Sequence, residues 1–165
     1  MRNSIHRELS EKFHTADWYK HILDFDGMRE IHKEIILAQS RITRRAEIIT
    51  SDKIVSELNL GFWVRLFNSE FERILWKDLR RSFPYMPKQD KKRHKISTPL
   101  NSIRNFRNRI YHYEPISWDF NELSKIHKEI YLLLHWINKD LPSLVEQLDR
   151  VPVLLNEAQI KLKKP

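Results

Sequence analysis

Residues 104 to 116 read RNFRNRIYHYEPI, a segment that gathers arginines, asparagines and one histidine before a proline ends it. At about 100° per residue on a helix, its polar and aromatic side chains share one side: Arg104, Arg107, Asn108, Tyr111 and His112. The opposite side carries Ile103, Phe106, Ile110 and Tyr113. A merely solvated face has no reason to prefer asparagine, a poor helix former, or a tyrosine beside an imidazole. The polar side is therefore suited to binding an anion.

The residue types on this side fit the cleavage of RNA without a metal ion. A neutral imidazole at His112 accepts the proton of a ribose 2′-hydroxyl, and a protonated one donates a proton to the leaving 5′-oxygen. Guanidinium groups at Arg104 and Arg107 converge with His112 on one phosphate and stabilise the charge of its transition state. Asn108 lies one turn before His112, so we expect its amide to contact or orient the ring.

The same side chains also fit simpler roles. A single histidine among arginines on a basic helix is common at a protein surface or at the rim of a core, where it performs no catalysis. The residue types alone leave open a catalytically silent RNA-binding or antitoxin-like protein. They also leave open a purely structural helical protein that binds no RNA.

The composition predicts that helices position these residues. The chain has 165 residues, of which 41% are hydrophobic and 32% are charged, and it contains only two glycines. Such a glycine-poor, charge-rich and aliphatic composition favours helices over sheets with many turns. The length is usual for one domain. We therefore predict an all-α protein with a single domain over residues 1–165.

The charge balance restricts the partners. A net charge of +8 and a pI of about 9.7 favour a polyanionic partner, either nucleic acid or an anionic membrane surface. The absence of cysteine excludes disulfides and thiolate zinc sites. No apolar run approaches the ~20 residues that cross a bilayer, and the amino terminus is too charged for a signal peptide. We expect a cytoplasmic protein with no membrane partner.

Apolar periodicity and capping residues predict the individual helices. The expected helices cover residues 3–13, 27–47, 51–67, 68–83 and 99–114, followed by one at 119–141 and a short helix in the tail. Ser51 or Asp52 is expected to cap the third helix. The helix that Pro142 stops is expected to begin near Trp118 or Asp119.

Trp18 and Tyr19 are expected in a connector, and Gly61 is expected to break the helical register. Pro99 is expected at the first position of the helix that carries the RNFRNRIYHYEPI segment.

A basic loop is predicted before that helix, at residues 84–98. It contains two prolines and the run KQDKKRHK, so the chain is expected to be exposed there. Lys91, Lys92 and Arg93 are its candidate phosphate-binding residues, because lysine and arginine beside a cleft attract RNA.

The segment RNRIYHYEPI, with Arg107 and Asn108 followed by three residues and His112, resembles the R-N-x-x-x-H signature of HEPN domains. The resemblance is to the bacterial Abi-like (abortive infection) family in particular. GFWVRLF at 61–67, LW at 75–76 and FP at 83–84 occur in the same order in that family, so the resemblance covers roughly residues 18–150.

This resemblance implies a helical bundle that dimerises and brings two motif helices together in a composite ribonuclease cleft. Arg107 and His112 would be catalytic, Asn108 would orient the histidine or the phosphate, and Glu114 would support phosphate binding. No cofactor is expected. The expected partners are RNA, a second copy of the chain and a cognate antitoxin. The predicted function is a metal-independent endoribonuclease of a toxin or phage-defence system.

The sequence departs from the family in two places. Tyr111 and Tyr113 stand where the family often has a small residue and a second histidine. Tyr111 is expected either to stack on a base or to obstruct the cleft. RNSI begins at residue 2, whereas the family usually has helices before a similar segment, so an amino-terminal portion is expected to be missing and self-association to be favoured.

Other motifs for metal or nucleotide binding are not found. HKE at 32–34 and again at 127–129 does not place histidine and glutamate on one helix face, and H-E-x-x-H does not occur. A chain with two glycines has no glycine-rich phosphate loop. We therefore predict no metal site.

Overall fold

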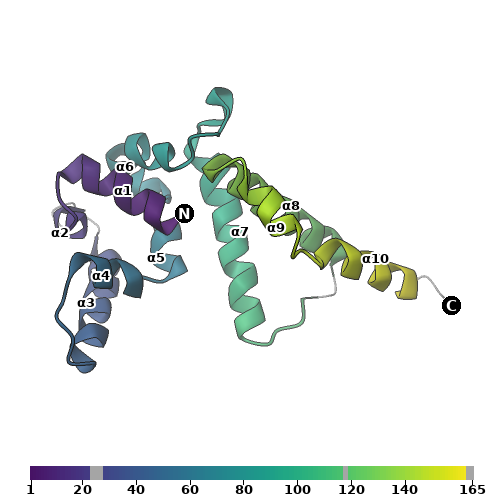
Figure 1. Cartoon of the computed structure of the whole chain (residues 1–165), viewed down its shortest axis with the longest axis horizontal. Helices are drawn as coiled ribbons and strands as arrows, with labels where there is room; N and C mark the ends of the chain where they lie inside the picture. Colours follow the sequence, from purple (N-terminus) through teal and green to yellow (C-terminus); the bar gives the residue numbers. More distant parts are fainter. Residues whose placement is uncertain (23–27, 117–118, 163–165) are drawn as a thin grey trace. The chain divides into compact units, whose positions relative to one another are not determined.

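The computed structural model describes residues 1–22, 28–116 and 119–162. Within these ranges every regular element is a helix, which confirms the all-α prediction. The helices belong to two compact units, residues 1–82 and residues 83–165 (Figure 1). We describe each unit by itself. The expectation of one domain over the whole chain stays a prediction.

The described residues of the first unit form helices of 5 to 16 residues and two 3₁₀ turns. In chain order they are α1 (Arg2–Phe13), α2 (Trp18–Ile22), α3 (Arg29–Arg44), α4 (Ser51–Glu57), α5 (Leu60–Arg65), the 3₁₀ turn η1 (Ser69–Phe71), α6 (Glu72–Leu79) and the 3₁₀ turn η2 (Arg80–Ser82). α1 lies against α2 and α6, and α3 lies against α4. The helices expected at 3–13 and 27–47 correspond to α1 and α3, but α3 ends at Arg44, three residues before the predicted end, and Gly27 lies outside the described residues.

Trp18 is at the centre of the core of this unit. Its ring lies 6.3 Å from that of Phe62 and 5.9 Å from that of Trp63, and its Nε1 donates a hydrogen bond of 2.8 Å to Nδ1 of His6. The prediction that Trp18 and Tyr19 lie in a connector was wrong, because both are buried in α2. Burying large aromatic rings overrides the weak helix signal of so short a segment.

Two capping residues account for the α4 and α5 boundaries. The Thr50 hydroxyl accepts a hydrogen bond from the Lys53 amide, so the cap of α4 lies one residue before the predicted position. The Asn59 side chain accepts one from the Phe62 amide at 2.9 Å and starts α5. Gly61 therefore lies inside α5, and the break occurs before it rather than at it.

The second unit contains the longer helices. They are the 3₁₀ turn η3 (Lys88–Asp90), α7 (Arg93–Tyr111), α8 (Phe120–Ile137), α9 (Leu141–Glu146) and α10 (Val151–Leu162). α8 packs against α7, α9 and α10, and Figure 1 shows α7 and α8 as the two long helices of this unit. α7 carries the candidate site, so its two ends determine where the candidate residues lie.

α7 begins several residues earlier than the sequence predicted. It starts at Arg93, and Pro99 lies inside it rather than at its first position. Ile96 and Leu100 lie one turn apart and are both buried, with exposed fractions of 0% and 5%. Burial of this apolar pair favours a helix that includes residues 93–98, although Pro99 comes directly after them. Residues 84–98 are therefore not a continuous exposed loop.

The first half of α7 accommodates the proline through side-chain hydrogen bonds. Pro99 has no amide hydrogen, so the helical bond to the Lys95 carbonyl cannot form. The Asn101 amide group donates 2.8 Å to the Ser97 carbonyl, and the Arg93 guanidinium donates 2.9 Å to the Ser97 hydroxyl. These bonds add support to the turn on either side of the interruption.

α8 has the capping residue that the sequence predicted. One carboxylate oxygen of Asp119 accepts hydrogen bonds from the Asn121 amide at 2.9 Å and the Glu122 amide at 3.0 Å. Trp118, the alternative start, lies outside the described residues. The helix ends at Ile137, and Pro142 lies in the first turn of α9 instead of stopping α8. Proline is well tolerated there because the first helical amides have no partner in the helix.

A partly buried aspartate, Asp149, joins the start of α10 to α8. Asp149 Oδ2 accepts a hydrogen bond of 2.7 Å from the Tyr131 hydroxyl and lies 2.5 Å from Nε2 of His127. Its other oxygen accepts a bond of 2.9 Å from the Val151 amide at the start of α10. Burial alone would raise the pKa of Asp149, but the bonds with Tyr131 and His127 outweigh burial and hold the pKa below its ordinary value.

Asp17 has the corresponding role in the first unit. Its carboxylate accepts hydrogen bonds from Lys20 Nζ at 2.6 Å, from the Ser51 hydroxyl at 2.5 Å and from the Tyr19 hydroxyl at 2.7 Å. It thereby connects α2 to the first residue of α4. These bonds, led by that from Lys20, lower the pKa of Asp17 to about 2.

We predict that Asp17 stabilises the fold in a pH-dependent way. A carboxylate whose pKa is lower in the folded chain contributes stability above its unfolded value of about 3.9 and loses it as the pH falls towards the folded value of about 2. In urea unfolding, Asp17→Asn should lower the midpoint at neutral pH, and the difference from the parent should shrink between about pH 4 and about pH 2.

The matched control for this measurement is Asp140→Asn. Asp140 is an exposed aspartate at the start of α9 that makes no side-chain capping bond there. Its replacement should leave the midpoint nearly unchanged throughout this pH range. A difference between Asp17→Asn and the parent that stays constant from neutral to acid pH would contradict the role of Asp17.

Candidate functional site

The predicted motif occupies the carboxyl end of α7. Arg104, Arg107, Asn108 and Tyr111 lie in its last two turns, and His112 is the residue that ends it. The His112 amide still donates to the Asn108 carbonyl at 3.0 Å, so the imidazole follows directly from the helical register. Arg104 is partly buried and the other four side chains are exposed. The structure thus places the predicted polar residues together at one helix end.

The turn after His112 has the hydrogen bonds of a Schellman motif. The Tyr113 amide donates 3.1 Å to the Ile110 carbonyl, and the Glu114 amide donates 3.0 Å to the Arg109 carbonyl. Tyr113 has a φ of 55°, which lies in the left-handed region. Glycine usually occupies this position because it has no Cβ. Tyr113 was predicted on the apolar side of the helix, but it lies beyond the helix end and its ring is 96% exposed.

Arg109 braces this turn. Its Nη2 donates 2.7 Å to the Pro115 carbonyl, and its Nε lies 3.4 Å from a carboxylate oxygen of Glu114. Arg109 was not among the predicted site residues, and a partner that is a backbone carbonyl leaves no pattern in a sequence. Glu114 was predicted to support phosphate binding, and its carboxylate pairs with Arg109 here. Its role towards phosphate stays a prediction.

Arg107 is held by its neighbours on the helix. Its guanidinium lies 4.2 Å from the centre of the Tyr111 ring, and its Nη1 donates 3.4 Å to the side-chain oxygen of Asn108. In the described chain no hydrogen bond joins the Asn108 side chain to the His112 ring. The orienting partner of Asn108 in this structure is therefore Arg107, and its expected effect on His112 stays a prediction.

The charges at this end of α7 are available to an anion. Arg104 donates 3.3 Å to Asn105, which is neutral, and no described carboxylate forms an ion pair with Arg104 or Arg107. Nor does any side chain in the described ranges form a hydrogen bond with the His112 ring. Two guanidinium groups and an imidazole on exposed turns can bind phosphate and transfer a proton to or from it.

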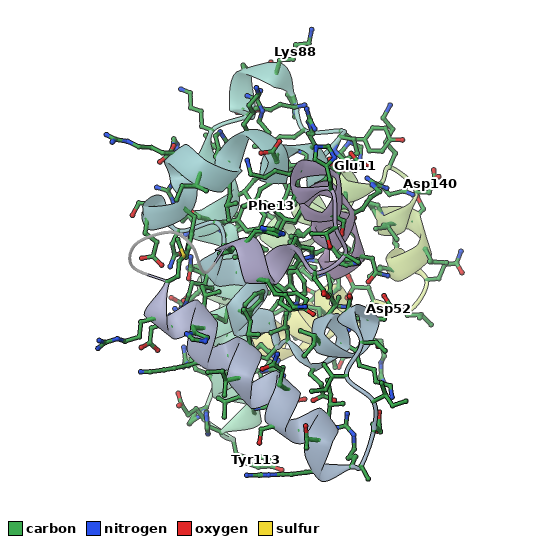
Figure 2. All side chains as sticks on the ribbon, turned by 90° about the vertical axis from the view of Figure 1, so that its left-hand side faces the viewer. Glu11, Phe13, Asp52, Lys88, Tyr113 and Asp140 are labelled. Carbon is green, nitrogen blue, oxygen red and sulfur yellow. The ribbon has the colours of Figure 1, made fainter. Side chains whose placement is uncertain are left out.

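The predicted basic phosphate-binding residues lie at the other end of the same helix. Lys91, Lys92 and Arg93 precede or begin α7, whereas His112 ends it, and a helix of 19 residues is roughly 27 Å long. Figure 2 shows the labelled Lys88 and Tyr113 at opposite ends of the view. Within one chain, the structure does not bring the predicted basic residues to the motif. Their contribution to RNA binding stays a prediction.

Two hollows in the second unit are further candidates. One is an apolar cavity of about 390 Å³ bounded by α7, α8 and α10. It is lined by Phe106, Ile116, Phe120, Leu123, Ile126, His127, Ile130, Val151, Leu154 and Leu155. His127 is its polar member and is already engaged by Asp149. The cavity therefore has space for an apolar group but has no second polar group for chemistry.

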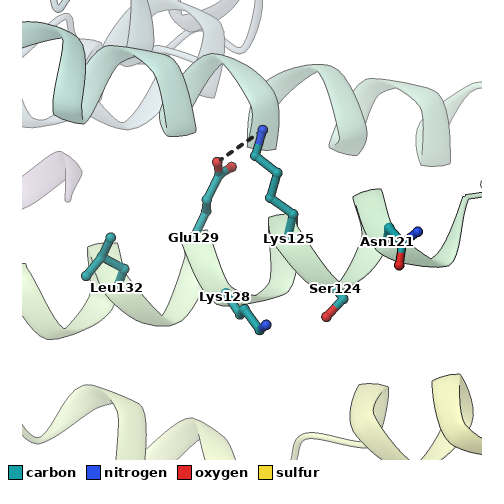
Figure 3. A pocket seen from close by; sticks show the side chains of 6 residues that line it. All are labelled: Asn121, Ser124, Lys125, Lys128, Glu129 and Leu132. Atoms are coloured by element: carbon teal, nitrogen blue, oxygen red, sulfur yellow. Dashed lines mark ion pairs between the residues drawn. The ribbon is translucent and has the colours of Figure 1, made fainter.

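The second hollow runs along α8 (Figure 3). Lys125 and Glu129 point to the same side of the helix there, with 4.0 Å between Lys125 Nζ and Glu129 Oε1. The other oxygen of Glu129, Oε2, is buried and has no hydrogen-bond partner among the described residues. The hollow contains lysines and one carboxylate, but no histidine that could pair with its serine, Ser124. It is a weaker candidate than the end of α7.

The described part of the chain contains neither a group of side chains that could bind a metal ion nor a helix that could cross a membrane. Within residues 1–22, 28–116 and 119–162, no three histidine, aspartate or glutamate side chains form a group that could hold a metal ion. Among the described helices, none has both the length and the apolar character that crossing a bilayer requires.

Comparisons with known proteins do not identify a relative. No protein-family model matches the sequence, and no curated protein and no solved structure is significantly similar to it. The resemblance to HEPN domains therefore rests on the motifs at 61–67, 75–76, 83–84 and 107–116. The function has to be argued from the end of α7 itself.

We predict that Tyr113→Gly stabilises the fold. The left-handed conformation costs an ordinary residue roughly 1–2 kcal/mol, and glycine avoids this cost but has a more flexible unfolded state. The exposed ring contributes little burial. The net gain in the free energy of unfolding should be about 1 kcal/mol, measured by urea denaturation.

Tyr113→Ala separates the backbone effect from the loss of the ring. Alanine keeps the Cβ, so it should give no comparable gain, and its free energy of unfolding should stay within about 0.5 kcal/mol of the parent. Equal stabilisation by glycine and alanine would show that the left-handed backbone is not the source of the effect.

Proposed function

We propose that the carboxyl end of α7 binds RNA and cleaves it by attack of the ribose 2′-hydroxyl, without a metal ion. The observation that carries the proposal is the grouping of exposed Arg107, Asn108 and His112 at one helix end, with no carboxylate paired to Arg107 in the described chain. The R-N-x-x-x-H spacing and the net charge of +8 support the same assignment.

Each group has a defined part in the reaction. His112 accepts the proton of the 2′-hydroxyl as its oxygen forms a bond to phosphorus. Arg107, supported by Arg104, stabilises the additional negative charge on the phosphate oxygens. The bond from phosphorus to the 5′-oxygen then breaks, and a protonated imidazole donates a proton to that oxygen. The products are a 2′,3′-cyclic phosphate and a 5′-hydroxyl.

A second copy of the chain supplies the second imidazole. One histidine cannot be the base and the acid in the same step, and the only other histidine of α7, His94, lies at its opposite end. A two-fold dimer brings His112 of each copy to a shared cleft. Exposed apolar side chains of α9, α10 and the turn between them offer a surface for pairing: Leu144, Leu148, Val151, Val153, Leu154 and Ile160.

The biological setting follows from the resemblance to Abi-like HEPN proteins. A cytoplasmic RNA-cleaving toxin of a phage-defence system, restrained by a cognate antitoxin, fits a small basic protein of this kind. The second candidate is a silent RNA-binding protein. It is favoured by one observation, because the Asn108 side chain contacts Arg107 and not His112, so in this structure it does not orient the ring.

Alanine substitutions at the motif test the catalytic assignment. His112→Ala should reduce cleavage of total tRNA roughly 100-fold or more and should keep most RNA binding, because one neutral imidazole contributes little to affinity. Arg107→Ala should reduce both. Cleavage is measured in the presence of EDTA, and the ends of the products are identified. His94→Ala, at the other end of α7, is the matched control and should cleave like the parent.

Two results would overturn the enzyme assignment. One is cleavage by His112→Ala at the parental rate, and the other is equal cleavage of RNA and of a substrate with 2′-deoxyribose at the cut position. A parent protein that binds tRNA but never cuts it, with binding lost in Arg107→Ala, would establish the silent binder instead.

The dimer is tested by light scattering. The parent should have the mass of two chains at micromolar concentration, and Leu148→Glu combined with Val153→Glu should give single chains with little cleavage, because charged groups oppose pairing of an apolar surface. Ile48→Glu, which changes an exposed apolar residue of the first unit, is the control and should leave the dimer intact. A parent that is a single chain and retains full activity would contradict the dimer.

A further inference from the structure

The two residues that flank His112 in the sequence, Tyr111 and Tyr113, are both tyrosines exposed to solvent. The Tyr111 side chain is 67% exposed and that of Tyr113 is 96% exposed. By contrast, Tyr19 is buried, Tyr131 is partly buried and bonded to Asp149, and Tyr85 is 43% exposed. The most exposed tyrosines of the chain therefore lie at the candidate site.

Both rings are attached to an ordered backbone. Tyr111 ends α7, and the Arg107 guanidinium lies 4.2 Å from its ring centre. Tyr113 is held in its left-handed conformation by its own bond to Ile110 and by the following bond to the Arg109 carbonyl. An aromatic group that is already ordered before binding loses less conformational entropy when a ligand arrives.

His112 is itself exposed. In the described part of the chain, no aromatic contact and no hydrogen bond joins His112 to Tyr111 or Tyr113. The guanidinium of Arg107 covers one face of the Tyr111 ring and leaves the other face to a planar ligand. The Tyr113 ring has both faces in water. These are the surfaces on which unpaired bases stack.

We propose that Tyr111 and Tyr113 form a stacking platform for the bases that flank the cleaved phosphate, so that the substrate class is single-stranded RNA. This inference rests on the proposed function, because it assigns a substrate to the same site. Bases in a duplex are stacked on one another, so a paired strand offers them to neither ring. Backbone contacts from Arg104 and Arg107 act on either kind of RNA, whereas the rings select unpaired segments.

The test is a binding measurement in the His112→Ala background, where the RNA stays intact. The probes are a short fluorescent oligouridylate and the duplex of the same oligonucleotide with oligoadenylate. Tyr113→Gly and Tyr111→Leu should each weaken binding of the single strand about tenfold, which is the magnitude of one lost stacking contact, and should change duplex binding by less than about twofold. Tyr111→Phe and Tyr113→Phe keep the rings and should bind like the background protein.

Tyr113→Gly also distinguishes recognition from folding. It should raise the melting temperature while it lowers the affinity for the single strand, a combination that a purely structural role of Tyr113 does not produce. An abasic site in the oligouridylate should cause the same loss with the tyrosine present and little further loss in Tyr113→Gly, as expected for two partners of one contact.

The outcomes separate this inference from the proposed function. Unchanged single-strand affinity in both ring-deleted variants, or equal losses for single strand and duplex, would overturn the platform even if the parent cleaves RNA. Ring-dependent binding by a protein whose parent never cleaves RNA would support the platform and overturn the nuclease. A protein that binds neither probe would overturn both.

Discussion

The way in which α7 ends determines the geometry of the whole candidate site. The last carbonyls of a helix have no partner within it, and here the amides of Tyr113 and Glu114 supply two of the missing hydrogen bonds. The Arg109 side chain then holds the chain that leaves the helix through the Pro115 carbonyl. These bonds close the turn and position Tyr113, whereas Tyr111 and His112 follow the helical register of α7. In the proposed function, catalysis and base recognition would both take place at this helix end.

Electrostatics favours cations at this end of α7. The carbonyls give the carboxyl end of a helix a partial negative charge, which stabilises Arg104, Arg107 and Arg109 in the last turns. The opposite end has the less favourable arrangement, because Lys92 and Arg93 meet the positive end of the helix and no side chain caps it. The two basic regions of α7 therefore differ in their electrostatic cost, although they look alike in the sequence.

The sequence predicted elements with strong local signals and missed those that depend on packing. Asp119 and the apolar periodicity after it identified the start of α8, and the polar side of the motif helix was placed correctly. The start of α7 was missed because it has no capping side chain and because a proline inside a helix normally indicates a boundary. The burial of Trp18 depends on contacts with residues more than forty positions away, which no local pattern reveals.

Local sequence patterns also could not predict the backbone conformation and the hydrogen bonds at the end of α7. In a sequence, a glycine is the usual sign of a left-handed backbone conformation. The described chain has three left-handed residues that are not glycine, and the sequence gives no sign of them: His14, Ala46 and Tyr113. The hydrogen bond from the Arg109 side chain to the carbonyl six residues later could not be predicted from the sequence either, because every residue has a carbonyl.

Pro99 removes one backbone hydrogen bond from the interior of α7, and a helix bends most easily at such a position. The missing hydrogen bond lies about twelve residues before the end of the helix, a distance of roughly 18 Å along its axis. A change of about 20° in the bend at such a proline would displace the far end by about 6 Å, which is comparable to the spacing of two side chains on neighbouring turns. Ile96, Ser97 and Leu100 are buried around Pro99, so we expect their packing to influence the bend of α7 and hence the position of its carboxyl end.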